Sequence, residues 1–266
     1  MAFQFHKYSG TGNDFIVVDN RTRVFSLDKA VWATLCRRGT GIGADGVLLV
    51  EKHPSLDFSM RYLNADGGEV SMCGNGARSI SHYCHHILKM KVDGKDEGHF
   101  TFMTKAGIHE SWVRGDEVKL KLPGVRELNA ISLDGMVNAK QFYFSNTGVP
   151  HAVFEVSDVD SFDVLNVGAR VRYDKRFPEG ANANFYEVIS PRKIKLRTYE
   201  RGVEGETLAC GTGAVASAVC FKHFYGGDSL VEVETRGGKL LIELASGLSW
   251  VFLSGEVKCL FKGETF

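Results

Sequence analysis

The chain carries one ten-residue pattern twice, and this repeat constrains its fold more than any other feature. Residues 68–77 read GEVSMCGNGA and residues 205–214 read GETLACGTGA, so both copies follow G-E-x-x-x-C-G-x-G-A. The repeated cysteines, Cys73 and Cys210, lie about half of the 266-residue chain apart. Two further pairs recur in the same order: Thr11-Gly12 with Thr147-Gly148, and Gly43-Ala44-Asp45 with Gly180-Ala181-Asn182. The sequence therefore predicts an internal duplication that gives two related halves.

Composition narrows the class of protein. The chain holds 32 basic and 32 acidic residues and has no net charge, which argues against nucleic acid or an anionic membrane as a partner. Its 44% hydrophobic and 24% charged residues are ordinary for a soluble globular protein. The first residues contain no apolar run of signal-peptide length, and no stretch has the length of a membrane span. We expect a cytoplasmic protein.

The six cysteines fall into two groups. None forms a C-x-x-C pair, and in a cytoplasmic chain we expect reduced thiols rather than disulfides. Cys73 and Cys210 stand among glycines, whereas the other four are predicted to be small buried hydrophobic residues: Cys36, Cys84, Cys220 and Cys259. We expect no metal site, because consecutive helical residues such as those of Cys84-His85-His86 point in different directions.

Each repeated cysteine precedes Gly-x-Gly-Ala at the predicted start of a helix. Unpaired N–H groups and the helix dipole at such a position stabilise a thiolate and can bind a carboxylate. With two copies, the thiolate of Cys73 or Cys210 could remove an α-proton while the opposite thiol returns one to the other face. This is general acid and base catalysis that inverts a carbon. No sequence pattern indicates pyridoxal phosphate, so no cofactor is expected.

Several motifs together resemble the diaminopimelate epimerase family. The matching stretches span residues 7 to 214: residues 12–15, 43–46, 64–67 and 72–78, Pro150-His151, Asn182, residues 199–202 and residues 209–213. The related proline racemase group shares a duplicated fold and paired cysteines, but Met-Cys-Gly-Asn-Gly-Ala-Arg and Tyr-Glu-Arg-Gly resemble the diaminopimelate group better.

The resemblance implies a cofactor-independent isomerase that interconverts LL- and meso-diaminopimelate, on the route to lysine and peptidoglycan. Cys73 and Cys210 would be its acid and base, and His151 and Glu200 would lie near the thiols and assist proton movement. The reacting carboxylate would be held by backbone N–H groups at Gly74, Asn75, Gly211 and Thr212. The distal amino and carboxyl groups would be held by Asn13, Asn64, Asn182, Glu200 and Arg201. A homodimer is a possible assembly.

One departure from the family pattern keeps alternatives open. Many members carry Asn before the Pro-His pair, where this chain has Val149. A racemase of another amino acid on the same scaffold is therefore an alternative. A transferase or hydrolase with one cysteine nucleophile and a non-catalytic amino-acid-binding protein are two others.

The predicted fold class is α/β (α+β), with two pseudo-symmetric halves. Each half is a mostly antiparallel sheet wrapped around a central helix, and the active site is expected in the cleft between them. Helical periodicity covers residues 27–38, 77–88 and 214–224, with Ser26 or Asp28 capping the first. The predicted domains are residues 1–122 plus about 256–266, and residues 123–255, with a loop-like stretch over 123–135. By resemblance, the last strand returns to the first half.

Overall fold

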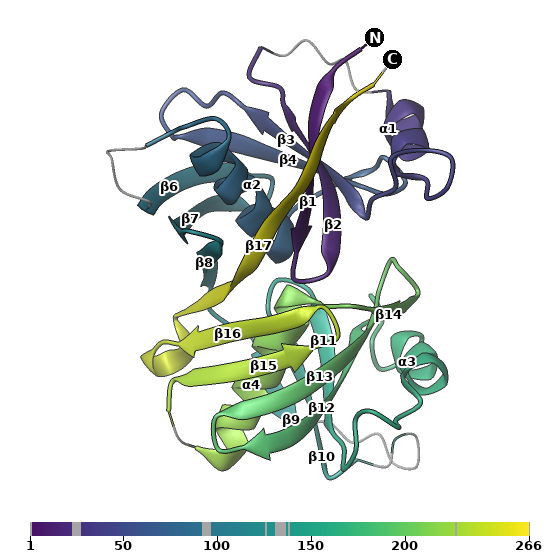
Figure 1. Cartoon of the computed structure of the whole chain (residues 1–266). Helices are drawn as coiled ribbons and strands as arrows, with labels where there is room; N and C mark the ends of the chain where they lie inside the picture. The colour runs from purple at the N-terminus through teal and green to yellow at the C-terminus, as the bar shows by residue number, and fades with distance from the viewer. Residues whose placement is uncertain are drawn as a thin grey trace. The chain divides into compact units, whose positions relative to one another are not determined.

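The computed structural model describes residues 2–22, 28–91, 97–125, 127–130, 137, 139–226 and 228–265. Its contacts divide the chain into two compact units (Figure 1). Unit 1 holds Met1–Lys121 with Ser254–Phe266, and unit 2 holds Leu122–Leu253. Both units combine strands with helices, so the predicted mixed α/β class with two related halves is confirmed.

Unit 1 joins parallel and antiparallel strand pairs in a fixed order. Strands β1–β2 and β3–β4 pair antiparallel, β2–β3 and β4–β6 pair parallel, and β4–β5, β6–β7 and β7–β8 pair antiparallel. The elements are β1 (Gln4–Gly10), β2 (Asn13–Asp19), α1 (Lys29–Cys36), β3 (Gly46–Glu51), β4 (Phe58–Asn64), β5 (Glu69–Val70), α2 (Gly74–His86), β6 (Glu97–Thr104), β7 (Gly107–Arg114) and β8 (Glu117–Pro123).

Unit 2 repeats that order. Strands β10–β11 and β12–β13 pair antiparallel, β11–β12 and β13–β15 pair parallel, and β13–β14 and β15–β16 pair antiparallel. The sequence repeat therefore corresponds to a repeated fold. The elements are β9 (Glu127–Ala130), β10 (Gln141–Asn146), β11 (Pro150–Glu155), α3 (Val164–Arg172), β12 (Asn182–Ser190), β13 (Lys193–Glu200), β14 (Gly205–Thr207), α4 (Gly211–Tyr225), β15 (Leu230–Thr235), β16 (Gly238–Leu244) and the short 3-10 helix η1 (Ser246–Leu248).

The last strand, β17 (Trp250–Glu264), runs beside β1 in unit 1 (Figure 1). The two strands pair antiparallel from Gln4↔Glu264 to Gly10↔Val257. The backbone N–H of Val257 also donates to the carbonyl of Asp116, 2.8 Å away. The expected return of the last strand to the first half is thus made by one continuous strand.

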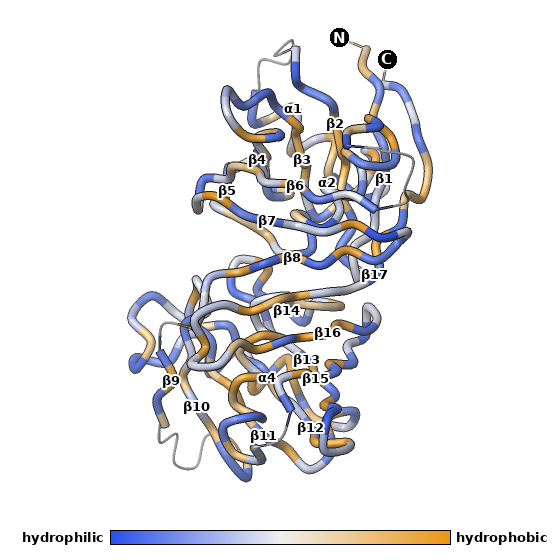
Figure 2. Tube along the Cα trace, turned by 90° about the vertical axis from the view of Figure 1, so that its left-hand side faces the viewer, coloured by the Kyte–Doolittle hydropathy of each residue, from blue (hydrophilic) through white to orange (hydrophobic). Residues whose placement is uncertain are grey.

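A buried helix lies at the centre of each unit. Helix α2 packs against β1, β2, β3, β4 and β7, and every residue from Gly74 to His85 is buried. Helix α4 packs against β10, β11, β12, β13, β15 and β16. Strand β8 buries every second residue, and the resulting change of hydropathy along it is visible in Figure 2. Both helices begin three residues before the predicted starts, immediately after Cys73 and Cys210.

Sequence periodicity missed helix α3 and strand β9. Helix α3 was not predicted, although Asp163 caps it by accepting a hydrogen bond from the N–H of Asn166 at 3.2 Å. Its three valines and one glycine are poor helix formers, so packing rather than propensity stabilises it. Strand β9 lies inside the stretch predicted to be a loop, and it pairs with β10. Asp28 caps α1, whereas residue 27 and Ser26 lie outside the described residues.

One prediction about the cysteines was wrong. Cys36, Cys84 and Cys220 are buried as predicted, but Cys259 is exposed. It lies on β17 in a run of exposed residues that includes Leu260 and Phe261. An apolar strand sequence does not show which face of the strand is covered by other elements. In this part of β17 the side chains are exposed.

Candidate active site

Cys73 occupies the N-cap of the central helix of unit 1. Its Sγ accepts a hydrogen bond from the backbone N–H of Gly76 at 3.5 Å, and its carbonyl accepts one from Ala77 at 2.8 Å. The side chain is half-buried. The sulfur therefore lies where the helix presents the N–H groups and positive dipole end of its first turn, as the sequence predicted. Gly74 and Asn75 are the first two residues of this turn.

Cys210 occupies the same position in unit 2. It is the N-cap of α4, its carbonyl accepts from the N–H of Ala214 at 2.9 Å, and it is 6% exposed. Its Sγ lies 3.6 Å from Oγ1 of Thr212. The hydroxyl of Thr147 donates to the carbonyl of Thr212 at 3.1 Å and fixes the first turn of the helix. Gly211 and Thr212 thus supply the first two N–H positions of α4.

Asn13 and Asn75 are joined beside Cys73. Nδ2 of Asn75 donates to Oδ1 of Asn13, and Nδ2 of Asn13 donates to Oδ2 of Asp45 at 3.0 Å. The sequence predicted roles for both asparagines but none for Asp45. The neighbouring Asp14 carboxyl is partly buried, which raises its pKa, but hydrogen bonds from Arg38 and Lys7 outweigh this and lower the pKa to about 2. The Asp14 carboxylate is therefore charged near neutral pH, and Asp45, which binds Asn13, also accepts a hydrogen bond from the backbone N–H of Asp14 at 3.1 Å.

Asn64 lies at the end of β4 and is held by its own turn. Its backbone N–H donates to the carbonyl of Gly68 at 2.8 Å, and its carbonyl accepts from Gly67 at 2.8 Å. The hydroxyl of Tyr62 donates to Oδ1 of Asn64 at 3.2 Å. The amide oxygen is therefore already engaged, and Nδ2 is the group that remains for a further acceptor.

His151 is completely buried on β11. Its Nδ1 lies 3.1 Å from Nδ2 of Asn184, which also faces the carbonyls of Ala152 at 3.1 Å and Asn182 at 3.3 Å. Carbonyl oxygens only accept, so the amino group of Asn184 is the part that points at the ring, and Nδ1 is the acceptor. Burial, with a smaller effect from the charge of Arg201, lowers the pKa of His151 to about 3. The ring is therefore neutral, with its proton on Nε2.

Asn182 and Arg201 are brought together in unit 2. Oδ1 of Asn182 accepts from the backbone N–H of Arg201 at 2.8 Å, and its Nδ2 donates to the carbonyl of Pro150 at 3.3 Å. Nη1 of Arg201 donates to the carbonyl of Glu179 at 2.9 Å. Since Asn182 is also the register partner of His151, Asn182, Arg201 and His151 lie at the same end of three neighbouring strands.

Glu200 ends β13, next to Arg201. The hydroxyl of Thr207 donates to its Oε2 at 2.9 Å, and its carbonyl accepts from the N–H of Glu204 at 2.9 Å. Sequence reasoning missed Thr207, and it also missed Asn184, Asp45 and Arg78, although Arg78 stands inside the matching motif. The signal for Asn184 was available, because it follows Asn182 by two residues on β12 and so lies on the same face.

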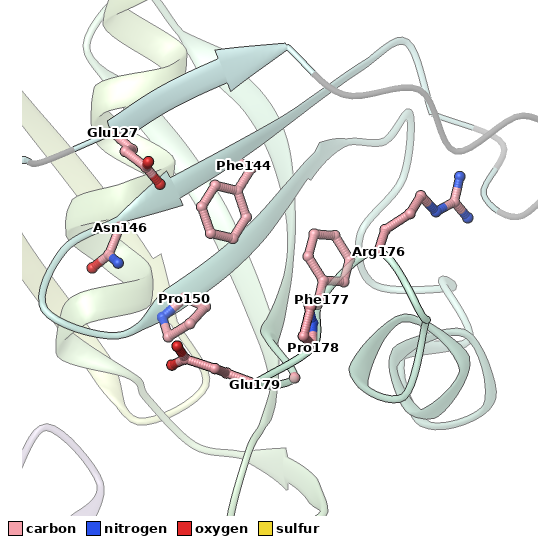
Figure 3. A pocket seen from close by; sticks show the side chains of 9 residues that line it. Glu127, Phe144, Asn146, Pro150, Arg176, Phe177, Pro178 and Glu179 are labelled. Carbon is pink, nitrogen blue, oxygen red and sulfur yellow. The ribbon is translucent and has the colours of Figure 1, made fainter.

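A cavity of about 200 Å³ in unit 2 adjoins Asn182 and Arg201, because its lining residues Pro150 and Glu179 accept hydrogen bonds from those two side chains (Figure 3). The rings of Phe144 and Phe177 stack in its wall with centroids 5.8 Å apart. None of the predicted site residues lines it. The lining residues are Glu127, Phe144, Asn146, Pro150, Arg176, Phe177, Pro178, Glu179 and Gly180.

Neither a metal cluster nor a membrane-spanning helix occurs in the described part of the chain. Among those residues, no three His, Cys, Asp or Glu side chains are grouped as metal ligands. No described helix is both long and apolar enough to cross a membrane.

Comparison with known sequences decides the family. The sequence profile of "Diaminopimelate epimerase" matches residues 5–123 and 143–260, which cover most of both units. The chain belongs to the diaminopimelate epimerase family. A diaminopimelate epimerase of Chlorobaculum tepidum is 39% identical over 260 residues, covering 96% of this chain and 98% of that protein. One from Methanocella arvoryzae is 39% identical over 276 residues, covering 98% and 96%. The family expected from the sequence motifs is thereby confirmed.

Solved structures share the fold of this diaminopimelate epimerase family member at low sequence identity. A phenazine biosynthesis protein of the PhzF family from Enterococcus faecalis has a TM-score of 0.76 and 14% identity, covering 100% of both chains. A hydroxyproline epimerase from Agrobacterium vitis has a TM-score of 0.74 and 15% identity, covering 99% of this chain and 92% of that one. At such identities the likeness concerns the fold alone.

Proposed function

We propose that this protein is a two-base epimerase that converts LL-diaminopimelate to meso-diaminopimelate. The observation that carries the proposal is the repeated placement of Cys73 and Cys210, each capping a buried Gly-x-Gly-Ala helix within a member of the diaminopimelate epimerase family. Two sulfurs of this kind, supplied by related units, suit two proton transfers at one carbon.

The proposed reaction needs only acid and base groups. One thiolate removes the α-proton, so a C–H bond breaks and an S–H bond forms. The thiol of the other cysteine then delivers its proton to the opposite face, and the electron pair left on carbon forms the new C–H bond. Developing charge on the substrate carboxylate is stabilised by the N–H groups at Gly74, Asn75, Gly211 and Thr212. The two sulfurs exchange protonation states, and the scheme needs no cofactor.

Within this proposal, His151 donates a hydrogen bond and does not act as a base. Its Nε2 carries the proton, is buried, and has no hydrogen-bond partner among the described residues. The pKa of about 3 keeps the ring neutral near neutral pH. A neutral donor of this kind can stabilise a nearby thiolate or carboxylate without competing for the α-proton.

The distal end of the substrate is assigned to polar residues of both units. Arg201 suits the distal carboxylate, Glu200 suits the distal ammonium, and amides fill the remaining hydrogen bonds. The amides proposed for this task are Asn13, Asn64 and Asn182.

A substrate panel in deuterated water tests the proposal. LL-diaminopimelate, other diamino acids, glutamate and proline are each incubated with the enzyme, and NMR follows loss of the α-proton signal. We expect exchange with inversion for diaminopimelate, well above that for the others. Faster exchange of another amino acid would favour the alternative racemase, and binding without exchange would favour a binding protein. A covalent adduct in the intact mass would indicate a cysteine nucleophile instead.

Val149 gives a matched test of substrate choice. Its backbone carbonyl accepts from the N–H of Thr147 at 3.3 Å, so the loop before β11 does not depend on the Val149 side chain for this contact. We expect Val149→Asn to lower KM for diaminopimelate, because an amide adds a hydrogen bond that an apolar side chain cannot make. Val149→Leu is the control, and it should not lower KM.

We also propose that the enzyme is a cytoplasmic homodimer. All six cysteines are free thiols, as suits a reducing compartment. Leu260 and Phe261 on β17 are 52% and 50% exposed, and such an apolar pair suits burial against a second copy of the chain. Light scattering on the purified protein tests the assembly. We expect the mass of a dimer for the wild type, and a monomer for Phe261→Lys.

A further inference from the structure

Arg78 is the largest fully buried side chain of unit 1, and it lies on α2 one turn beyond Cys73. Nη2 donates to Oγ1 of Thr11 at 2.9 Å and to Oδ1 of Asn75 at 2.7 Å. Nη1 makes a longer contact with the carbonyl of Glu256 at 3.4 Å, and Nε has no partner among the described residues. A buried guanidinium with an unused donor is costly unless it serves a purpose.

The guanidinium decides which way two amides face. Arginine can only donate, so the atom of Asn75 that it contacts must be the oxygen. The amino group of Asn75 then points at Oδ1 of Asn13, and the amino group of Asn13 points at Asp45, whose carboxylate can only accept. A cation at one end and an anion at the other thus fix both amides between them. If the amide of Asn75 rotated by 180°, its N–H group would face the Arg78 guanidinium. If the amide of Asn13 did so, its N–H group would face that of Asn75.

The charge of Arg78 has no carboxylate to balance it. Within the described residues, no Asp or Glu forms an ion pair with this side chain. Burial lowers the pKa of Arg78 to about 10, and the charge of the Cys73 sulfur partly opposes that shift. The guanidinium is therefore still protonated near neutral pH, and an ionised Cys73 sulfur would favour its charged form.

We propose that Arg78 is a positioning residue of the epimerase, which holds Asn75 and Asn13 in one orientation and whose buried charge favours the thiolate of Cys73. The statement that this positioning serves catalysis rests on the proposed function. Its first test does not, because the reactivity of the Cys73 thiol can be measured in the enzyme without substrate.

The first test compares iodoacetamide alkylation of Cys73, resolved by peptide mass spectrometry, in wild type and Arg78→Met across a pH series. We expect the rate for Cys73 at pH 7 to fall about tenfold, equivalent to a rise of about one unit in the thiol pKa. Arg114→Met is the matched control, since Arg114 is in the same unit and its side chain is 84% exposed. It removes one positive charge and should leave the rate unchanged. An unchanged rate in folded Arg78→Met would overturn the proposal, whatever the substrate proves to be.

Arg78→Lys separates charge from orientation and keeps the proposal testable if Arg78→Met does not fold. Lysine retains the charge but lacks the planar fork, so we expect Cys73 alkylation within about twofold of wild type. KM for diaminopimelate should rise severalfold with a smaller change in kcat, because the two amides lose their anchor. Wild-type KM in this variant, or a tenfold loss of alkylation rate, would contradict the assignment.

Discussion

Asn184 directs its amide nitrogen at Nδ1 of His151 across 3.1 Å, and this contact sets the proton of the imidazole on Nε2. We predict that nitrogen-15 NMR of the His151 ring shows the Nε2–H tautomer and no titration between pH 5 and 8, as a pKa of about 3 requires. Asn184→Ala removes the contact and should allow the other tautomer. A proton on Nδ1 in the wild type, or a pKa above 5, would contradict this assignment.

The lowered pKa of His151 also predicts that the folded protein loses stability in acid. The folded pKa of His151 is below its ordinary value of 6.5, so between about pH 3 and 6.5 the unfolded chain binds more protons than the folded chain. Stability therefore rises with pH through that window, and the contribution of His151 is lost as pH falls below 6.5. We expect His151→Gln to lose less stability than wild type between pH 7 and 4.5 in urea denaturation. An equal loss in both proteins would show that His151 is protonated in the folded state.

The third glycine of the second repeat is predicted to be essential for packing. A Cβ at Gly213 would lie 2.3 Å from Oδ1 of Asn184 and 3.3 Å from Cβ of Cys210. Alanine favours a helix by about 1 kcal/mol over glycine, but Asn184 is buried and bonded on several sides and cannot move away. We expect Gly213→Ala to destabilise the protein by about 1–3 kcal/mol and to reduce activity.

Gly205→Ala is the control for that substitution. A Cβ there would meet no atom within 4 Å, so it should leave thermal stability nearly unchanged. Equal melting temperatures for the two variants would refute the packing argument.

The glutamate of each repeat pairs with an arginine, but at different depths. Glu206 binds Arg197 through two contacts of 2.7 Å, and the two side chains are only 10% and 8% exposed. Glu69 binds Arg61 at 2.9 Å, and both are 35% exposed. We expect Glu206→Gln to cost about 3–5 kcal/mol of unfolding free energy, because it leaves a charge buried. Glu69→Gln should cost about 0–1 kcal/mol because solvent screens that pair. Equal costs in chemical denaturation would contradict this difference.

The sequence predicted those parts of the fold that repeat or alternate. The duplicated motif indicated two related halves, and the apolar periodicity after each cysteine indicated the central helices α2 and α4. It did not predict α3, whose valines resemble a strand, or the exposure of Cys259. Which face of a strand is covered depends on partners far along the chain, and local pattern carries no such information.

The site residues also divide into those that the sequence predicted and those that depend on contacts between distant parts of the chain. The residues to which the resemblance assigns catalytic or binding roles were predicted, whereas the residues that hold them in place were not, even where these stand inside a matching motif. Asp45, Arg78 and Asn184 act through hydrogen bonds to Asn13, Asn75 and His151, and such pairings appear only when the strands and helix are assembled. The buried charge of Arg78 was hidden in the sequence, because arginine is ordinarily exposed.

The most direct test of the two-base mechanism follows inversion of LL-diaminopimelate in deuterated water with Cys73→Ala and Cys210→Ala. Each variant lacks one of the two proton-transfer groups, so we predict that neither converts LL- to meso-diaminopimelate, while the wild type does so with deuterium entering the α-carbon. Full epimerisation by either variant would contradict the mechanism.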